Sequence, residues 1–172
     1  MPGAKAPLYH SSVKKTVYLS LGSNLGDRRA NLRNAIGKLL GLGNLIAVSS
    51  FYETEPVDFV DQPWFLNCAV ALQTALKAED FLAEIAAIER DMGRQRNILK
   101  GPRTMDIDIL LFGKAVLKTP RLTIPHPAMH VRRFVLEPLA EIAPEVQHPV
   151  LKKTVRELLN ELPEAAQIFR RT

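Results

Sequence analysis

The order in which hydrophobic periodicity changes along the chain constrains its fold more than any other feature. A strand-like alternation recurs in four segments, and helical spacing of apolar residues separates the first from the second and the third from the fourth. The predicted strands cover residues 16–23, 45–54, 65–74 and 104–113, and the predicted helices cover residues 24–43 and 78–93. This β-α-β-β-α-β order predicts an α+β, ferredoxin-like fold: an antiparallel sheet with both helices on one face and the other face free for a site.

The segments outside this core add helices at the C-terminal side. Residues 129–142 predict one helix, and the capping-box sequence from Thr154 to Glu157 predicts the start of another. We interpret residues 1–15 as a loose N-terminal extension and residues 16–172 as one domain, which is long enough to bury a core without disulfides. No apolar run approaches the ~18 residues of a membrane helix. The single cysteine, Cys68, lies in an apolar strand, which indicates an inert thiol in a cytoplasmic protein.

The strand at residues 104–113 carries two aspartates that need an explanation. Because successive strand residues point to opposite faces, Asp106 and Asp108 should share one face. The residues predicted on the other face are Met105, Ile107, Ile109 and Leu111. Neighbouring carboxylates repel each other unless a cation lies between them. Taken alone, the pair is also compatible with two solvent-exposed acids on a half-buried strand.

The segment that leads into this strand is basic. Residues 90–103 hold one acidic residue, Asp91, and the basic residues Arg90, Arg94, Arg96, Lys100 and Arg103. Guanidinium groups next to paired carboxylates provide anion-binding groups beside a cation site, which is what a magnesium-bound polyphosphate requires. The formal net charge of +5 also suits an anionic partner.

Three further features matter only if they lie in the same site as the two aspartates: Phe65 with Asn67, Glu89, and His126. Phe65 and Asn67 project from the opposite face to the apolar residues of their strand, where a ring and an amide could bind a flat heterocycle; an ordinary strand is an equally good interpretation. Glu89 lies at the margin of a helix's apolar stripe, where a carboxylate more often simply reaches solvent. His126 lies between two prolines, and its surroundings favour hydrogen bonding to phosphate over metal binding.

The combination of motifs resembles the 6-hydroxymethyl-7,8-dihydropterin pyrophosphokinases, a family of folate biosynthesis. The resemblance runs from about Val17 to His148, in the family's order. Its segments are LSLGSNLGDR, SSFYETEPV, DQPWFLNCAVAL, IERDMGR, GPRTMDIDILLFG and RLTIPHPAMHVRRFVLEPLAEIAPE. The segment GPRTMDIDIL is the most specific of the six. Departures from the pattern of some members include Lys100 in place of tryptophan, Pro127 in place of tyrosine and Phe65 in place of tyrosine.

The resemblance implies an enzyme that transfers diphosphate from ATP to the hydroxymethyl group of the pterin and releases AMP. It implies that Asp106 and Asp108 hold two Mg²⁺ ions and that Arg94 and Arg103 are catalytic residues that bind phosphate. The implied ATP-binding residues are Leu82, Glu89, Arg94, Arg96, Lys100, Arg103, Ile109, Arg121, Thr123, His126 and Arg132. The implied pterin-binding residues are Thr54, Val57, Phe65, Asn67 and Phe134, with the two phenylalanines on either side of the ring.

The same resemblance shapes the expected mechanism and partners. No residue stands out as a general base, so we interpret Asp106 and Asp108 as metal ligands and not as proton acceptors. The loops at residues 55–64 and 94–101 flank the expected site and are candidate lids. We expect small-molecule substrates, no nucleic-acid or membrane partner, and a monomer.

Two other functions are alternatives. A nucleotidyltransferase also pairs a Gly-Ser turn with a D-x-D strand, but it keeps the two within a short helix of each other, whereas Gly22 and Ser23 lie far before Asp106 here. An RNA-binding module of the same layout carries stacking aromatics on its central strands, where this chain has acids that repel phosphate. A P-loop kinase is excluded because the chain has no G-x-x-x-x-G-K-[ST] segment.

Overall fold

A computed structural model describes residues 13–56, 61–93, 103–164 and 169–172. The elements are β1 (Lys15–Ser23), α1 (Arg28–Leu39), β2 (Asn44–Val48), β3 (Tyr52–Thr54), β4 (Phe65–Thr74), α2 (Ala78–Asp91), β5 (Asp106–Phe112), β6 (Leu117–Lys118), β7 (Thr123–Ile124), the 3₁₀ helix η1 (Met129–Val131), α3 (Arg133–Ile142), α4 (Val155–Asn160) and β8 (Phe169–Arg171). The predicted extension at residues 1–15 lies mostly outside the described residues, and β1 begins at Lys15.

The main sheet has the predicted antiparallel core. Its strand order is β5-β1-β4-β3-β8, and β2 pairs with β4 alongside β3. The strand order and the α1 and α2 crossovers are those of a ferredoxin-like fold, as predicted. β8 pairs with β3 and was not expected, and neither was the small β6–β7 sheet.

The predicted strand at residues 45–54 is two strands, β2 and β3. Ser49 interrupts it: its backbone N–H donates to the carbonyl of Ala69 at 2.9 Å, and its hydroxyl accepts the Ala69 N–H at 2.8 Å. The neighbouring Ser50 donates both its N–H and its hydroxyl to the Glu141 carboxylate of α3, each at 2.6 Å. Serine side chains that bond to nearby backbone groups compete with a regular ladder, which explains the break.

Helices α1 and α2 cover one face of the sheet, as predicted. Their apolar side chains meet those of β1, β4 and β5 in one core. Its fully buried residues include Leu19, Leu21, Leu32, Leu39, Leu72, Phe81 and Ile85. Leu66, Cys68, Val70 and Leu72 share this face of β4, and Met105, Ile107 and Ile109 share it on and just before β5, as the alternation predicted.

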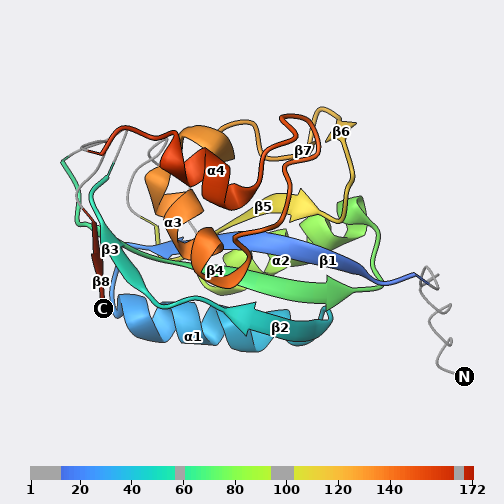
Figure 1. Cartoon of the computed structure of the whole chain (residues 1–172). Coiled ribbons are helices and arrows are strands. Elements are labelled where there is room, and N and C mark those ends of the chain that lie inside the picture. Colours follow the sequence, from blue (N-terminus) through green and yellow to red (C-terminus); the bar gives the residue numbers. More distant parts are fainter. Residues whose placement is uncertain (1–12, 57–60, 94–102, 165–168) are drawn as a thin grey trace, which may run out of the picture.

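The sequence led us to expect that the opposite face would be free. This is wrong, because α3 and α4 cover much of it. Figure 1 shows these two helices above the sheet, with α1 below it. Ala69 of β4 and Leu111 of β5 pack there against Val135, Leu139 and Val155. Between the described residues, a cavity remains at the end of this face where β1 and β4 meet near Gly22 and Asn67.

A β-bulge in β5 corrects the predicted position of Leu111. Leu19 of β1 pairs with Ile109, and the preceding residue, Tyr18, pairs with Leu111. Leu110 therefore has no partner of its own on β1 and is an extra residue in β5. The insertion reverses the alternation, and Leu111 therefore packs with α3 instead of with α1 and α2. The carbonyl of Leu110 accepts the backbone N–H of His126 at 2.9 Å.

Several predicted boundaries also shift. α1 begins at Arg28, because Asp27 caps it by accepting the Ala30 N–H at 3.1 Å. The predicted helix at 129–142 is the 3₁₀ helix η1 followed by α3.

The capping box of α4 is confirmed: Thr154 Oγ1 accepts the Glu157 N–H at 3.1 Å, and the Glu157 carboxylate accepts the Thr154 N–H. Among the described residues, no helix has the length and apolar character needed to cross a bilayer.

The capping box gives a stability prediction. Thr154→Ala removes the acceptor for the Glu157 N–H, so we expect the free energy of unfolding to fall by about 1 kcal/mol. Thr154→Ser keeps the hydroxyl and should lose much less. Urea unfolding of the three proteins measures the difference, and equal losses for the alanine and serine variants would contradict a capping role.

Candidate active site

Three adjacent strands form the floor of a cavity of about 370 Å³. Asp106 and Asp108 of β5 lie opposite Gly22 and Ser20 of β1, respectively. On the other side of β1, Gly22 lies opposite Asn67 of β4. The cavity thus runs across the sheet from an amide on β4 to two carboxylates on β5.

The two aspartates lie among cations, as the sequence suggested. Arg103 Nη1 is 2.8 Å from Asp106 Oδ2. Partial burial raises the pKa of Asp108 to about 7, and repulsion from Asp106 acts in the same direction, whereas the nearby charge of Arg132 opposes it. Asp108 therefore lies where its negative charge is costly, and a bound cation would relieve that cost.

The residues at this end of the cavity suit Mg²⁺. Among the described residues, no group of three or more His, Cys, Asp or Glu side chains could enclose a metal. Mg²⁺ binds through one or two carboxylates and takes its other oxygens from water and phosphate, so a pair of aspartates in an open cavity fits this preference.

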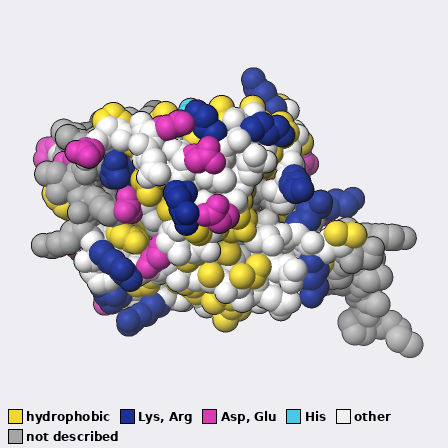
Figure 2. Space-filling view, viewed as in Figure 1, with side chains coloured by type: hydrophobic (Ala, Val, Ile, Leu, Met, Phe, Trp, Pro, Cys, Tyr) yellow, Lys and Arg dark blue, Asp and Glu magenta, His cyan; other side chains and the backbone are white. Residues whose placement is uncertain are grey.

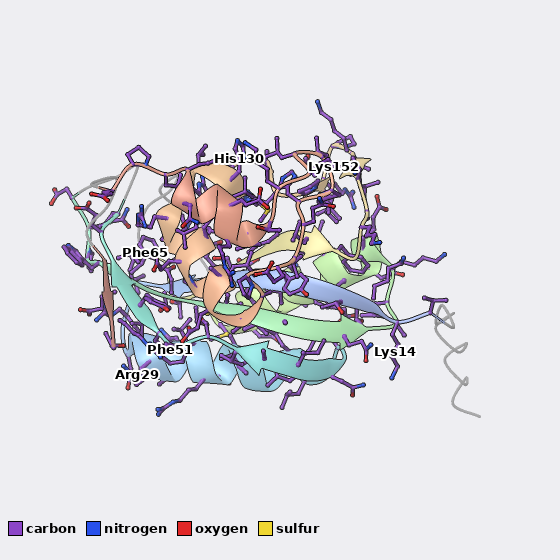
Figure 3. All side chains as sticks on the ribbon, viewed as in Figure 1. Lys14, Arg29, Phe51, Phe65, His130 and Lys152 are labelled. Atoms are coloured by element: carbon purple, nitrogen blue, oxygen red, sulfur yellow. The ribbon has the colours of Figure 1, made fainter. Side chains whose placement is uncertain are left out.

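The far end of the cavity suits a flat polar ligand. The buried Asn67 donates from Nδ2 to the hydroxyl of Thr54 on β3, which fixes the orientation of its amide. A Cβ at Gly22 would lie 2.6 Å from Asn67 Oδ1, so only glycine leaves room for this amide. Phe65 at the start of β4, labelled in Figure 3, and Phe134 of α3 also line the cavity. The guanidinium carbon of Arg132 lies 5.6 Å from the centre of the Phe134 ring.

A second cavity of about 290 Å³ adjoins the first. Arg121 and Thr123 line it with polar groups, and Leu82 and Ile109 line it with apolar ones. Four residues line both cavities and mark their junction: Leu82, Ile107, Asp108 and His126. Asp108 and His126 are the two with polar side chains.

His126 has a defined protonation state and orientation. Its Nδ1 accepts the Ala128 N–H at 3.1 Å, and its backbone N–H bonds to the bulged Leu110. Burial lowers the pKa of His126, and the charge of Arg132 lowers it further. The ring is therefore neutral at pH 7 with its proton on Nε2, which makes Nε2 a hydrogen-bond donor at the junction.

Glu89 has a structural role in addition to its place in the cavity lining. This buried carboxylate of α2 accepts the backbone N–H of Ile107 at 3.3 Å. In the described part of the chain β5 is the edge strand on this side of the sheet, so the bond satisfies an N–H that no described strand pairs with. Its negative charge also contributes to the raised pKa of Asp108.

Asn24 joins two segments that flank the cavity. Its Nδ2 donates to Gln62 Oε1 at 2.8 Å and to the Pro63 carbonyl at 3.0 Å. Its Oδ1 accepts the Arg103 N–H at 2.7 Å, and its own N–H donates to the Arg103 carbonyl at 3.1 Å. The buried Asn24 thus connects the candidate lid at residues 55–64 to Arg103, which follows the candidate lid at residues 94–101 in the sequence.

The structure brings together every predicted site residue that it describes. Those lining the first cavity are Thr54, Phe65, Asn67, Leu82, Glu89, Arg103, Asp106, Asp108, His126, Arg132 and Phe134, and those lining only the second are Ile109, Arg121 and Thr123. Val57, Arg94, Arg96 and Lys100 lie outside the described residues. The sequence interpretation did not assign six residues that line the first cavity: Ser20, Gly22, Glu55, Pro56, Gln62 and Ile107. Ser20 could have been found, because alternation places it opposite the buried Leu19 and Leu21.

Surface charge is mixed on the face that Figure 2 presents. Acidic and basic side chains are interspersed on the left and in the centre of this view, and basic side chains predominate on its right.

A family model described as 7,8-dihydro-6-hydroxymethylpterin-pyrophosphokinase (HPPK) matches residues 18–144. The chain belongs to this family. A Bacillus subtilis relative named 2-amino-4-hydroxy-6-hydroxymethyldihydropteridine pyrophosphokinase is 46% identical over 132 residues, which are 76% of this chain and 79% of the relative. A Pseudomonas aeruginosa relative of the same name is 45% identical, over 77% of this chain and 83% of the relative.

Longer proteins also contain a related segment. The Folic acid synthesis protein fol1 of Schizosaccharomyces pombe is 40% identical over 90% of this chain, which spans only 21% of that protein. The crystal structure of wild-type Plasmodium falciparum HPPK-DHPS with pteroate matches 90% of this chain, and 43% of its own chain, with a TM-score of 0.69 and 19% identity. This likeness supports the same fold for the HPPK family member described here.

Gly22 gives a second stability prediction. Gly22→Ala forces the buried Asn67 amide to move, so we expect a loss of about 1–3 kcal/mol in the free energy of unfolding. Gly37→Ala is the matched control, because it lies within α1 with open space around it and should gain about 0.5–1 kcal/mol. Urea unfolding measures the free energy of unfolding of both variants. No loss for Gly22→Ala would contradict the close contact with Asn67.

Asp108 gives a prediction for pH dependence. Between its ordinary pKa of 3.8 and its folded pKa of about 7, the folded protein keeps a proton that the unfolded chain releases, so stability falls as the pH rises through this range. Asp108→Asn removes this cost. With EDTA present to exclude metal ions, we expect the Tm of Asp108→Asn to exceed that of the wild type by little at pH 4 and by most at pH 8.

Scanning calorimetry at several pH values measures this gain. Glu145→Gln changes an exposed carboxylate that pairs with Arg156, and it should show no comparable growth of Tm with pH. A gain for Asp108→Asn that was the same at pH 4 and pH 8 would mean that Asp108 ionises normally in the folded protein.

Proposed function

We propose that this chain transfers diphosphate from ATP to the hydroxymethyl group of 6-hydroxymethyl-7,8-dihydropterin, giving AMP and the pterin diphosphate. Family membership supports the reaction. The observation that carries the proposal is the meeting of two cavities at Asp108 and His126. The first cavity suits a flat heterocycle, and the second suits a polyphosphate and the ring faces of a nucleotide base.

The first cavity binds the pterin in this proposal. Asn67 and Thr54 offer fixed donors and acceptors to the ring edge, and Phe65 and Phe134 contact its faces and exclude water. Val57 lies outside the described residues, and its contact with the pterin stays a prediction from the sequence resemblance. The hydroxymethyl group then points across β1 towards Asp106 and Asp108.

The second cavity and the junction bind ATP. Arg103, Arg121 and Arg132 supply positive charge for the phosphates, and neutral His126 donates a hydrogen bond from Nε2. Leu82 and Ile109 provide apolar contacts for the base. Arg94, Arg96 and Lys100 would add phosphate contacts from the segment outside the described residues.

Asp106 and Asp108 would hold two Mg²⁺ ions at the junction. When bound, Mg²⁺ neutralises the phosphate charge that develops during transfer and aligns the two reactants. The side chains act by holding and orienting: Arg103 keeps Asp106 in place, and Asn24 holds the backbone of Arg103. Transfer of this kind depends mainly on alignment and electrostatics, so no protein general base is needed in this account. The monomeric state, the cytoplasmic location and the absence of a nucleic-acid partner stay predictions.

Product analysis tests the proposed reaction. The protein is incubated with MgCl₂, ATP and the pterin, and the nucleotides are separated by chromatography. We expect AMP only when the pterin is present, and none in excess EDTA. Asp106→Ala and Asp108→Ala should each lower the rate at least about a hundredfold, because the metal contributes several kcal/mol to the barrier reduction.

Glu145→Gln is the control, since it changes an acid remote from both cavities and should keep the wild-type rate. ADP as the product would instead indicate transfer of a single phosphoryl group. Free pyrophosphate released from ATP would indicate a nucleotidyltransferase. Either product would contradict the proposal.

A further inference from the structure

Ser20 lies where β1 crosses the floor of the first cavity. It is opposite Asp108 of β5 on one side and Ala69 of β4 on the other. Its neighbours Leu19 and Leu21 point into the core beneath the sheet, so the Ser20 side chain is on the cavity face, where it forms part of the lining. It is only 6% exposed.

The Ser20 hydroxyl makes no hydrogen bond to any side chain or backbone group in the described part of the chain. Ser49, which is also 6% exposed, shows the contrast: its hydroxyl donates to the Ser50 carbonyl and accepts the Ala69 N–H, each at 2.8 Å. The Ser20 oxygen is not among the enclosed polar side-chain atoms that lack a partner in the described part of the chain, so it keeps access to the cavity. No described protein group competes for this hydroxyl, so it is available to hydrogen-bond to a molecule bound in the cavity.

The location of Ser20 indicates which part of a bound molecule it would meet. The lining runs from Asn67 on β4, over β1, to Asp106 and Asp108 on β5. Of the two β1 residues in that lining, Gly22 has no side chain, so the hydroxyl of Ser20 is the polar side-chain group that β1 contributes. A ligand that binds at Asn67 and reacts beside Asp108 must extend across β1, which lies between the two strands.

We propose that Ser20 is a substrate-binding residue whose Oγ hydrogen-bonds to the hydroxymethyl group of the bound pterin. This inference rests on the proposed function, because it takes the pterin as the occupant of the first cavity. The bond would hold the accepting oxygen at the carboxylate end of the cavity. The role concerns orientation of the acceptor substrate, and it is separate from the metal-binding role of Asp108.

Calorimetric titration with two ligands tests the proposal. The full chain, with Mg²⁺ and a non-hydrolysable ATP analogue, is titrated with 6-hydroxymethylpterin and with 6-methylpterin, which lacks the hydroxyl. We expect Ser20→Ala to raise the Kd for the hydroxymethyl compound about 3- to 10-fold, the range of a typical net hydrogen bond. For 6-methylpterin, the wild type and Ser20→Ala should bind within about 2-fold of each other.

Ser49→Ala is the matched control, because it removes an equally buried serine hydroxyl outside the cavity lining. It should lower Tm and leave both Kd values unchanged. Ser20→Thr retains a hydroxyl, and circular dichroism checks that each variant is folded.

Two results would overturn the inference while leaving the proposed function intact. One is an AMP-forming wild type in which Ser20→Ala binds 6-hydroxymethylpterin as tightly as the wild type does. The other is an equal loss of affinity for both pterins, which would place the Ser20 contact elsewhere than the hydroxymethyl group. A wild type that forms no AMP and binds neither pterin would instead contradict the proposed function itself.

Discussion

The repulsion between Asp106 and Asp108 is the constraint around which the cavity is organised. The two carboxylates share one face of an edge strand, and burial already makes the charge of Asp108 unfavourable. Arg103 pairs with Asp106, and Arg132 offsets part of the charge at Asp108. The remaining cost makes a cation at this position favourable, and the neighbouring cavity offers space for the polyphosphate that would bring further oxygen ligands.

The fold supports this arrangement from both sides of the sheet. α1 and α2 bury the apolar residues of β1, β4 and β5, which forces the aspartates and Ser20 to the opposite face. α3 and α4 close most of that face and contribute Phe134 to the cavity. The bulge at Leu110 binds the backbone of His126, so an irregularity in the strand of the aspartates also places the histidine at the junction of the two cavities.

Much of this could be predicted from local sequence patterns. Alternation placed Asp106 with Asp108 and Phe65 with Asn67, because each pair lies on a strand whose other face is uniformly apolar. The break at Ser49 and the bulge at Leu110 could not be predicted, since both depend on partners distant in the chain, Ala69 and Tyr18. The same reason hid the role of Asn24, whose four hydrogen bonds reach Gln62, Pro63 and Arg103. The free face was predicted wrongly because the packing direction of α3 and α4 is a tertiary property.

The measurement that tests the central claim most directly is the anomalous scattering of Mn²⁺ in crystals grown with the pterin and a non-hydrolysable ATP analogue. Mn²⁺ accepts the same oxygen ligands as Mg²⁺ and can be located without ambiguity. The account predicts two peaks beside Asp106 and Asp108, at the junction of the cavities, and their loss in Asp108→Asn. Peaks only at other positions, or reactants bound in the two cavities without metal at the aspartates, would contradict it.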